Sequence, residues 1–300
     1  MSVLLQMIQN VDVVIYHFFN EFAGNRFLDY LASFEENNNL LKGGLFLAMY
    51  CYLWFRAGSD QDRRRRAIIA IVAGALLALV ASRTIADFAP YRIRPMYDLH
   101  LQHHPYAFPI SPNLIKWSAF PSDTATFFFA LAFGLAHLSR RLTIPAMLYV
   151  AGWICLPRLF LGVHYASDEV VGGVIGITAV WASLNVGWLQ SGLATGLLAL
   201  VKSKPEVFYP AAFLTSFEMG VLFDDIRAAA STVFHIAHVE VSEFHLGLAA
   251  FATLGFLMIA GYLVFLARKR RKFAFHASQR TKERVTAYRF SSLEQPAKPS

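Results

Sequence analysis

The residues best suited to chemistry lie in three short segments, of which the last is the most informative. It reads Arg158-Leu-Phe-Leu-Gly-Val-His164-Tyr-Ala-Ser-Asp168, with an aspartate four residues after a histidine. Residues four apart share one face of a helix, so we expect Asp168 to hold the tautomer of His164 and to stabilise its imidazolium. A neutral imidazole held in this way can attack phosphorus and form a covalent phosphoenzyme. The alternative is an aspartate that caps a helix near a surface histidine.

The other two segments supply groups that bind an anion. They read Asp87-Phe-Ala-Pro-Tyr-Arg-Ile-Arg94-Pro95 and Phe120-Pro121-Ser122-Asp123-Thr124. Arg94 and Arg158 each carry a planar guanidinium group that can clamp two phosphate oxygens. Ser122 is placed to cap a helix, and the first amides of that helix, including the Asp123 amide, form an anion site with the help of the helix dipole. Together, the three segments predict a phosphate site.

The elements that carry these segments are expected to be membrane helices. Hydrophobic residues make up 56% of the chain and charged residues only 16%, whereas soluble domains carry roughly 25% charge. Long stretches without Asp, Glu, Lys or Arg include 67–82, 170–201 and 246–267. A transmembrane helix needs about 20 mostly apolar residues. The sequence therefore predicts an all-α, polytopic transmembrane bundle. A large soluble core is the alternative, and the number of apolar stretches argues against it.

About six to seven spans are expected, at 41–56, 67–88, 122–138, 142–157, 168–188, 206–223 and 246–267. The span at 206–223 contains Glu218, which is costly in lipid, so a helix lying in the interface is an equal alternative there. Basic clusters at 63–66, 140–141 and 268–272 flank apolar stretches and are expected in the cytoplasm, together with the C-terminus. Residues 89–121 and 158–167 then lie at the outer face, where the phosphate site would form.

The chain is expected to divide into four parts. Residues 1–39 form an N-terminal segment, in which 3–21 reads as an amphipathic helix on the membrane surface. Residues 40–190 form the catalytic membrane core, 191–267 the C-terminal membrane helices with an outward loop, and 268–300 a basic cytoplasmic tail. The net charge of +7 is explained by the flanking clusters, so no nucleic-acid partner is expected.

The order and spacing of the three segments resemble the type 2 phosphatidic acid phosphatase superfamily, over roughly residues 40–190. That family has a lysine, six intervening residues and then Arg-Pro; a Pro-Ser-Gly-His segment; and a final Ser-Arg, five residues, His, three residues, Asp. Arg158, His164 and Asp168 fit the final motif, with Pro157 in place of its serine. Pro-Ser-Asp in the middle segment is similar to the bacterial branch that acts on undecaprenyl pyrophosphate. The resemblance implies a lipid phosphate substrate, a bacterial inner membrane with the site facing the periplasm, and no metal or other cofactor.

Two departures from the family pattern bear on function. Asp87 stands where the family has its lysine, and Arg83, one turn earlier, is a possible ion-pair partner for it. Arg92 and Lys116 are candidates for the missing cation.

Thr124 stands where the family has the histidine that protonates the leaving group. General acid catalysis is worth about 10²–10⁴-fold, and its loss matters least when the leaving group is itself a phosphate, whose second pKa is about 6. The departure therefore favours a lipid pyrophosphate donor. A close alternative is that a loop histidine supplies the acid, the candidates being His100, His103 and His104.

The function expected from these residues is hydrolysis of a polyprenyl pyrophosphate, or a related lipid phosphate, through a phosphohistidine. Two alternatives stay open. One is a phosphotransferase that passes the phosphate to a lipid or sugar acceptor held by residues 96–120 and 224–245. The other is a lipid-binding membrane protein that has lost the chemistry. The sequence leaves the lipid chain and the oligomeric state open.

Overall fold

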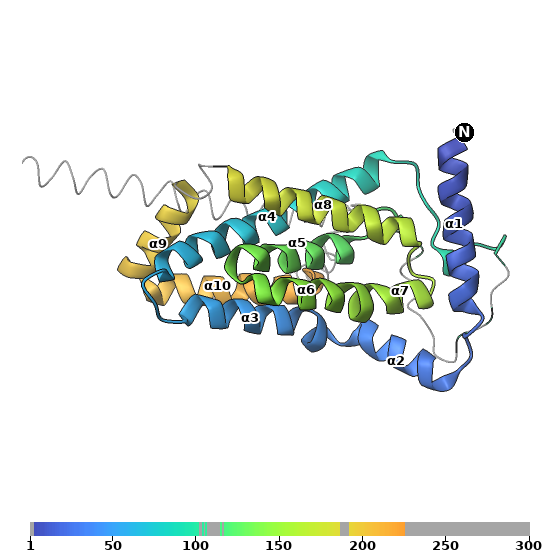
Figure 1. Ribbon diagram of the computed structural model, residues 1–300, viewed down its shortest axis with the longest axis horizontal. Coiled ribbons are helices and arrows are strands. Elements are labelled where there is room, and N and C mark those ends of the chain that lie inside the picture. The colour runs from blue at the N-terminus through green and yellow to red at the C-terminus, as the bar shows by residue number, and fades with distance from the viewer. Residues whose placement is uncertain are drawn as a thin grey trace, which may run out of the picture. The chain divides into compact units, whose positions relative to one another are not determined.

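The computed structural model describes residues 3–101, 104, 106, 115, 117–186 and 192–225 (Figure 1). Within these residues the structure is helical and contains no strand, which confirms the predicted fold class for this part of the chain. The helices are α1 (Val3–Asn20), α2 (Arg26–Asn37), α3 (Leu45–Phe55), α4 (Gln61–Phe88), α5 (Asp123–Leu138), α6 (Arg140–Tyr149), α7 (Leu156–Phe160), α8 (Ala166–Asn185), α9 (Ala194–Ser203) and α10 (Pro205–Gly220). Wider π-helical turns, Leu40–Gly44 and Val150–Cys155, lead into α3 and join α6 to α7.

Three of the described helical stretches are long and apolar enough to cross a membrane: Gln61–Phe88, Arg140–Phe160 and Ala166–Asn185. They correspond to the expected spans at 67–88, 142–157 and 168–188. Leu40–Phe55, Asp123–Leu138 and Ala194–Ser203 are apolar but shorter. The expected span at 246–267 lies outside the described residues. Large apolar side chains such as Ile144, Leu148, Val170 and Val174 are exposed on two of the long stretches, as lipid contact requires.

One helix was not anticipated. The apolar stretch at 170–201 continues past the end of α8, and its last part forms the separate helix α9. Pro205 then begins α10 at a position where its missing amide hydrogen costs nothing.

The centre of the fold is formed by α4, α5 and α8, which lie side by side (Figure 1). The backbones of α5 and α8 approach closely because Gly172 and Gly176 face α5. A Cβ atom added at Gly176 would lie 2.0 Å from the carbonyl oxygen of Thr126, and one at Gly172 would lie 2.4 Å from that of Ser122. Small residues four apart are a common way to let membrane helices approach. This contact fixes the start of α8 against the start of α5.

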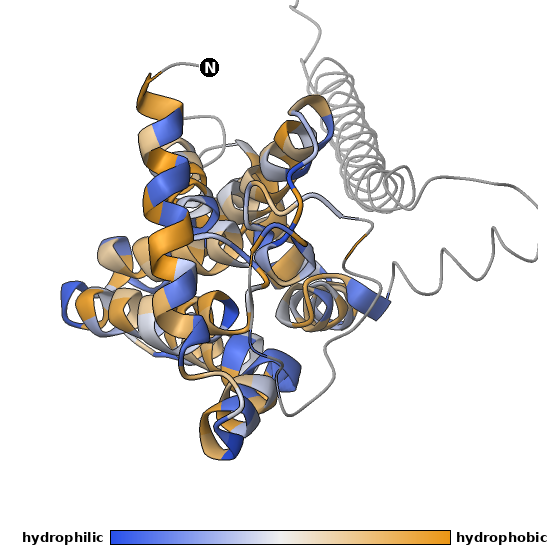
Figure 2. Ribbon diagram, turned by 90° about the vertical axis from the view of Figure 1, so that its right-hand side faces the viewer, coloured by the Kyte–Doolittle hydropathy of each residue, from blue (hydrophilic) through white to orange (hydrophobic). Residues whose placement is uncertain are grey.

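Seen along the bundle, α1 lies across the end at which α5 and α8 begin and α4 ends (Figures 1 and 2). It packs against α7 and α8. The predicted helix at 3–21 is thus present as a helix, and it adjoins the end of the bundle that carries the three motif segments.

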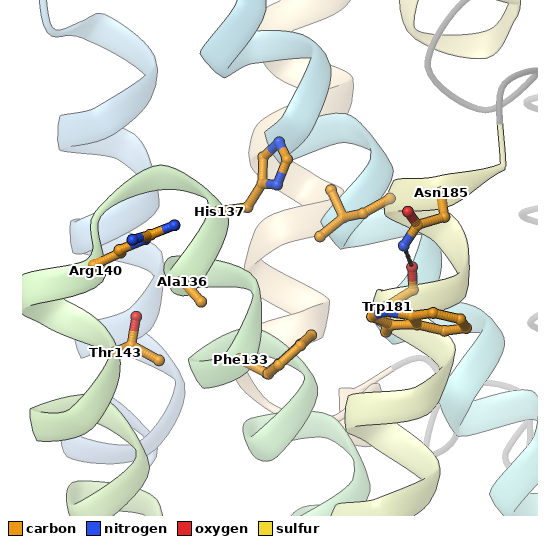
Figure 3. A pocket seen from close by; sticks show the side chains of 8 residues that line it. Phe133, Ala136, His137, Arg140, Thr143, Trp181 and Asn185 are labelled. Atoms are coloured by element: carbon orange, nitrogen blue, oxygen red, sulfur yellow. Dashed lines mark hydrogen bonds between the residues drawn. The ribbon is translucent and has the colours of Figure 1, made fainter.

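The opposite ends of α5 and α8 border a groove of about 470 Å³ (Figure 3). Its lining includes His137, Arg140, Trp181 and Asn185. Because it lies at the ends of α5 and α8 opposite to the motif segments, it is separate from them.

Candidate active site

His164 is the centre of the site, and its ring orientation is fixed by the backbone. It lies in the short loop between α7 and α8, where Gly162 adopts a φ of +64° that favours glycine. The side chain is only 4% exposed. Its Nδ1 lies 2.8 Å from the carbonyl oxygen of Ala119. A carbonyl oxygen can only accept a hydrogen bond, so Nδ1 carries the proton and Nε2 keeps its lone pair.

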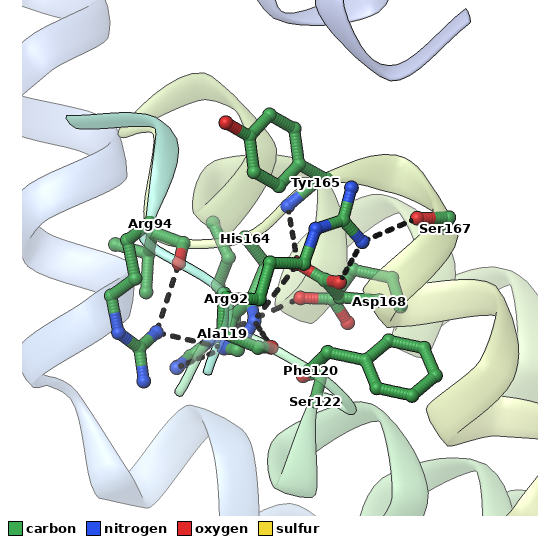
Figure 4. A network of polar contacts seen from close by, with 12 residues as sticks. Arg92, Arg94, Ala119, Phe120, Ser122, His164, Tyr165, Ser167 and Asp168 are labelled. Carbon is green, nitrogen blue, oxygen red and sulfur yellow. Dashed lines mark hydrogen bonds and ion pairs between the residues drawn. The ribbon is translucent and has the colours of Figure 1, made fainter. Parts of the chain in front are cut away.

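The lone pair of His164 faces two buried guanidinium groups, those of Arg94 and Arg158; Figure 4 labels Arg94 beside the ring. Arg94 Nη1 lies 3.2 Å from His164 Nε2, and Arg158 Nη2 lies 3.5 Å from it. Arg94 also donates to the carbonyl oxygen of Val163 at 2.9 Å, which holds it in place. An anion bound by both arginines would therefore lie directly at the nucleophilic nitrogen.

The same surroundings set the protonation states. Burial, followed by the charges of Arg94 and Arg158, holds the pKa of His164 well below its usual value. Burial also lowers the pKa of Arg94 to about 10, which leaves it charged at neutral pH. The free site thus combines a neutral imidazole with cationic neighbours, the state that attack on a phosphate requires.

Two carboxylates hold Arg158 from behind. Glu36 of α2 accepts from Arg158 Nη1 with both oxygens, at 2.7 and 2.9 Å. Glu169 lies 3.8 Å from Arg158 Nε. Glu36 therefore holds Nη1 of the guanidinium group and leaves Nη2 facing His164. The sequence contains little indication of this role for Glu36, because an acidic residue on a helix outside the membrane is usually exposed to solvent.

Glu35, beside Glu36, is buried in the same region. It is 1% exposed, and no hydrogen-bond donor reaches either carboxylate oxygen. Burial raises its pKa to about 8, so the group is mostly protonated at neutral pH.

Asp168 caps α8 and lies near His164, but it does not hold the tautomer of the imidazole, a role that the sequence predicted for it. It occupies the third position of α8, where its Oδ2 accepts from the amide of Tyr165 at 2.8 Å and caps the helix. The same oxygen lies 3.7 Å from His164 Nδ1. The direct partner of Nδ1 is the Ala119 carbonyl oxygen, so Asp168 acts on the imidazole mainly through its nearby charge.

Arg92 was a candidate for the missing phosphate cation, but the structure places it on the Asp168 side of the ring. Its Nη1 donates to Asp168 Oδ1 at 2.5 Å and to Ser167 Oγ at 2.8 Å. Its Nη2 donates to Asp12 of α1 at 2.6 Å, and the guanidinium group lies over the Tyr165 ring, 4.2 Å from its centroid. Figure 4 shows the contacts of Arg92 with Ser167 and Asp168 beside His164.

Arg83 is held at the start of α5 instead. It forms an ion pair with Asp123, which also accepts from Ser82 at 2.7 Å. The Trp117 ring covers its guanidinium group at 4.7 Å. Its positive charge contributes to lowering the pKa of both His164 and Arg94. The structure thus shows Arg83 paired with Asp123, and Asp87 is exposed at the end of α4.

The second motif forms the start of α5. Ser122 is the N-cap residue, and its hydroxyl accepts from the amide of Ala125 at 3.3 Å, which confirms the predicted cap. The Ser122 amide donates to the carbonyl oxygen of Asp168 at 3.2 Å, so the two motif segments are tied together. Thr124 is buried in the first turn of the helix.

The loop histidines are less well placed. The side chains of His100 and His104 are exposed, and the His104 amide donates to Asn20 Oδ1 at 2.7 Å. His103 and Lys116 lie outside the described residues. Within the described ranges, no group of three or more His, Cys, Asp or Glu residues is placed to hold a metal ion.

Comparison with known proteins gives one match. Residues 69–191 match the family model described as the PAP2 superfamily, which confirms the predicted resemblance. No curated protein and no solved structure matches the chain. The matched segment contains all three motifs, whereas α1 and α2, with Asp12 and Glu36, lie outside it.

Proposed function

We propose, with residues 69–191 as a PAP2-superfamily domain, that the chain is a membrane enzyme that cleaves lipid pyrophosphates through a phosphohistidine on His164. The observation that carries the proposal is the lone pair of His164 Nε2, which faces Arg94 and Arg158 at 3.2 and 3.5 Å. Phosphoryl transfer needs little from a protein beyond position and charge stabilisation, and this arrangement supplies both.

The reaction proceeds in two steps. His164 Nε2 attacks the terminal phosphorus, the bond to the bridging oxygen breaks, and the lipid monophosphate leaves. The phosphohistidine then carries a positive charge on its ring, which Asp168 stabilises from 3.7 Å. Water attacks phosphorus in the second step, inorganic phosphate is released, and His164 regains its lone pair. Arg94 and Arg158 hold the transferred oxygens throughout.

Thr124 favours a pyrophosphate over a phosphate monoester. It is buried at the start of α5 and carries no group that titrates near neutral pH. A phosphate leaves as an anion without a proton, whereas an alkoxide requires one. We therefore expect faster cleavage of polyprenyl pyrophosphate than of phosphatidic acid.

The test is phosphate release from undecaprenyl pyrophosphate and from phosphatidic acid by the purified protein in detergent. His164→Ala should abolish release and the acid-labile phosphoprotein, and His137→Ala, an exposed histidine at the other end of α5, serves as the control. Faster cleavage of phosphatidic acid would overturn the assignment of substrate. Release that survives in His164→Ala would overturn the phosphohistidine.

A phosphotransferase is the second candidate, because the site restricts access by water. His164 is 4% exposed and Asp168 is fully buried. A transferase would accumulate phosphoenzyme from the pyrophosphate and release it only when a lipid or sugar acceptor is added, which separates it from a hydrolase.

A further inference from the structure

The helix α1 presents its polar side to the protein. Asp12, Tyr16 and Asn20, four residues apart, are 2–3% exposed. Asp12 Oδ1 accepts from the Ser167 amide at 2.9 Å, and its Oδ2 accepts from Ser167 Oγ and from Arg92 Nη2, both at 2.6 Å. Asp12 is thus a buried carboxylate that is fully engaged with donors from other parts of the chain. Burying it without these donors would be costly, so the contact specifically fixes α1.

The opposite side of α1 is apolar and exposed. Met7, Val11, Val14 and Phe18 follow one another at spacings of four, three and four residues, which places them on one stripe. They are 60, 55, 68 and 57% exposed. Figure 2 shows hydrophobic and hydrophilic residues on different sides of this helix. The helix is therefore polar toward the protein and apolar toward its surroundings, the reverse of a helix on a soluble domain.

The direction of α1 identifies what covers this stripe. The long apolar helices α4 and α8 run along the bundle, whereas α1 lies across its end (Figure 1). With the bundle along the membrane normal, α1 lies parallel to the membrane surface, at the level of the phosphate site. A helix in that position buries its apolar stripe at the boundary between lipid headgroups and acyl chains.

We propose that α1 is a lipid-contacting helix that completes the phosphate site, with Asp12 as a positioning residue. Asp12 holds Arg92 Nη2, which directs Nη1 to Asp168, and Asp168 lies beside the imidazole of His164. This inference deepens the proposed function and rests on it. It also explains why Arg92 contacts Asp168, beside Nδ1 of the ring, whereas Arg94 and Arg158 face Nε2.

Removing the charge of Asp12 should slow the chemistry without weakening substrate binding. In Asp12→Asn the carboxylate of Asp168 alone balances Arg92, and a positively charged ring becomes less favourable. Loss of a charge-assisted hydrogen bond predicts a fall in kcat of about tenfold. KM should stay within about twofold, because Arg94 and Arg158 are untouched.

The first experiment measures kcat and KM for undecaprenyl pyrophosphate in Asp12→Asn, Arg92→Gln and the double variant, with Asn10→Ala as the control on an exposed side of α1. If Asp12 acts through Arg92, the double variant is no slower than Arg92→Gln alone. An unchanged kcat in Asp12→Asn would overturn the positioning role. The role would also be overturned if the losses of kcat in Asp12→Asn and Arg92→Gln add fully in the double variant while the unfolding temperature stays unchanged. An inactive unmodified protein would instead overturn the proposed function.

The second experiment does not depend on activity. Spin labels are attached to Val11→Cys, Val14→Cys and Asn10→Cys in a Cys51→Ser background, since Cys155 is buried. The protein is placed in vesicles of phosphatidylcholine and phosphatidylglycerol. The spin relaxation of the labels at 11 and 14 should be accelerated mainly by oxygen, which concentrates in lipid. The relaxation of the label at 10 should be accelerated mainly by a water-soluble nickel chelate. Equal access of the chelate to all three positions would refute lipid contact by the stripe.

Discussion

Replacing Glu36 by glutamine tests whether this residue supports the phosphate site or competes with the substrate. The carboxylate of Glu36 holds Arg158 Nη1 with both oxygens, at 2.7 and 2.9 Å. Arg158 in turn points Nη2 at His164. The substitution Glu36→Gln keeps the shape of the side chain and one acceptor oxygen, and it removes the negative charge.

The expected magnitude follows from these contacts. A hydrogen bond to a charged group contributes about 1.5–3 kcal/mol, whereas a neutral one contributes about 0.5–1.5 kcal/mol. Glu36 is partly exposed, with a side-chain exposure of 22%, so the difference between the two kinds of hydrogen bond lies near its lower end, at about 1 kcal/mol. That value corresponds to about a fivefold change in rate. If Glu36 positions Arg158, kcat/KM for lipid pyrophosphate falls about fivefold in Glu36→Gln.

The assay is steady-state cleavage of lipid pyrophosphate in detergent, with Glu21→Gln as the control because that carboxylate is exposed between α1 and α2. The direction in which kcat/KM changes shows whether Glu36 positions Arg158 or competes with the substrate for it. An increase in kcat/KM would refute the positioning argument, because it would mean that Glu36 occupies Arg158 in place of the substrate phosphate.

Three further predictions concern pH, packing and phosphate binding. The pKa of Glu35 is raised to about 8 in the folded protein, so the folded protein keeps a proton on this carboxyl group at pH values where the unfolded chain has lost it. The protonated group therefore contributes to the free energy of unfolding at low pH, and this contribution is lost as the pH rises through about 8. Glu35→Gln should therefore unfold at a higher temperature than the unmodified protein at pH near 9 and show little difference near pH 5. Gly176→Ala should lower the unfolding temperature by several degrees, because its Cβ would lie 2.0 Å from a carbonyl oxygen, whereas Gly152→Ala, which meets nothing within 4 Å, should not. Arg94→Lys keeps the charge but loses the planar donor pair, so kcat/KM should fall by about tenfold or more; an unchanged kcat/KM would show that Arg94 acts only as a point charge.

The sequence predicted the part of the site that depends on short-range spacing. Arg158, His164 and Asp168 lie within eleven residues of one another, and Ser122 has the side chain that an N-cap requires. The convergence of these segments followed from placing their helix ends at one face of a membrane bundle.

The groups that support the site were not predictable in the same way. Glu36 and Arg158 are 122 residues apart, and Asp12 and Ser167 are 155 apart. Such contacts depend on how α1 and α2 pack, and no local pattern encodes that. The side of the imidazole on which Arg92 lies is likewise a tertiary property, since Arg92 and Arg94 are two residues apart and point to different groups.

In the proposed reaction, the hydrogen bond from His164 Nδ1 to the Ala119 carbonyl oxygen also decides which isomer of phosphohistidine would form. With Nδ1 occupied by its proton, only Nε2 can accept the phosphoryl group, so the expected product is the tele isomer, 3-phosphohistidine. The acceptor is a backbone oxygen, which no side-chain substitution at position 119 removes. The regiochemistry of phosphorylation is therefore a property of the folded backbone, and isomer-specific antibodies against 1- and 3-phosphohistidine would read it directly from the trapped intermediate.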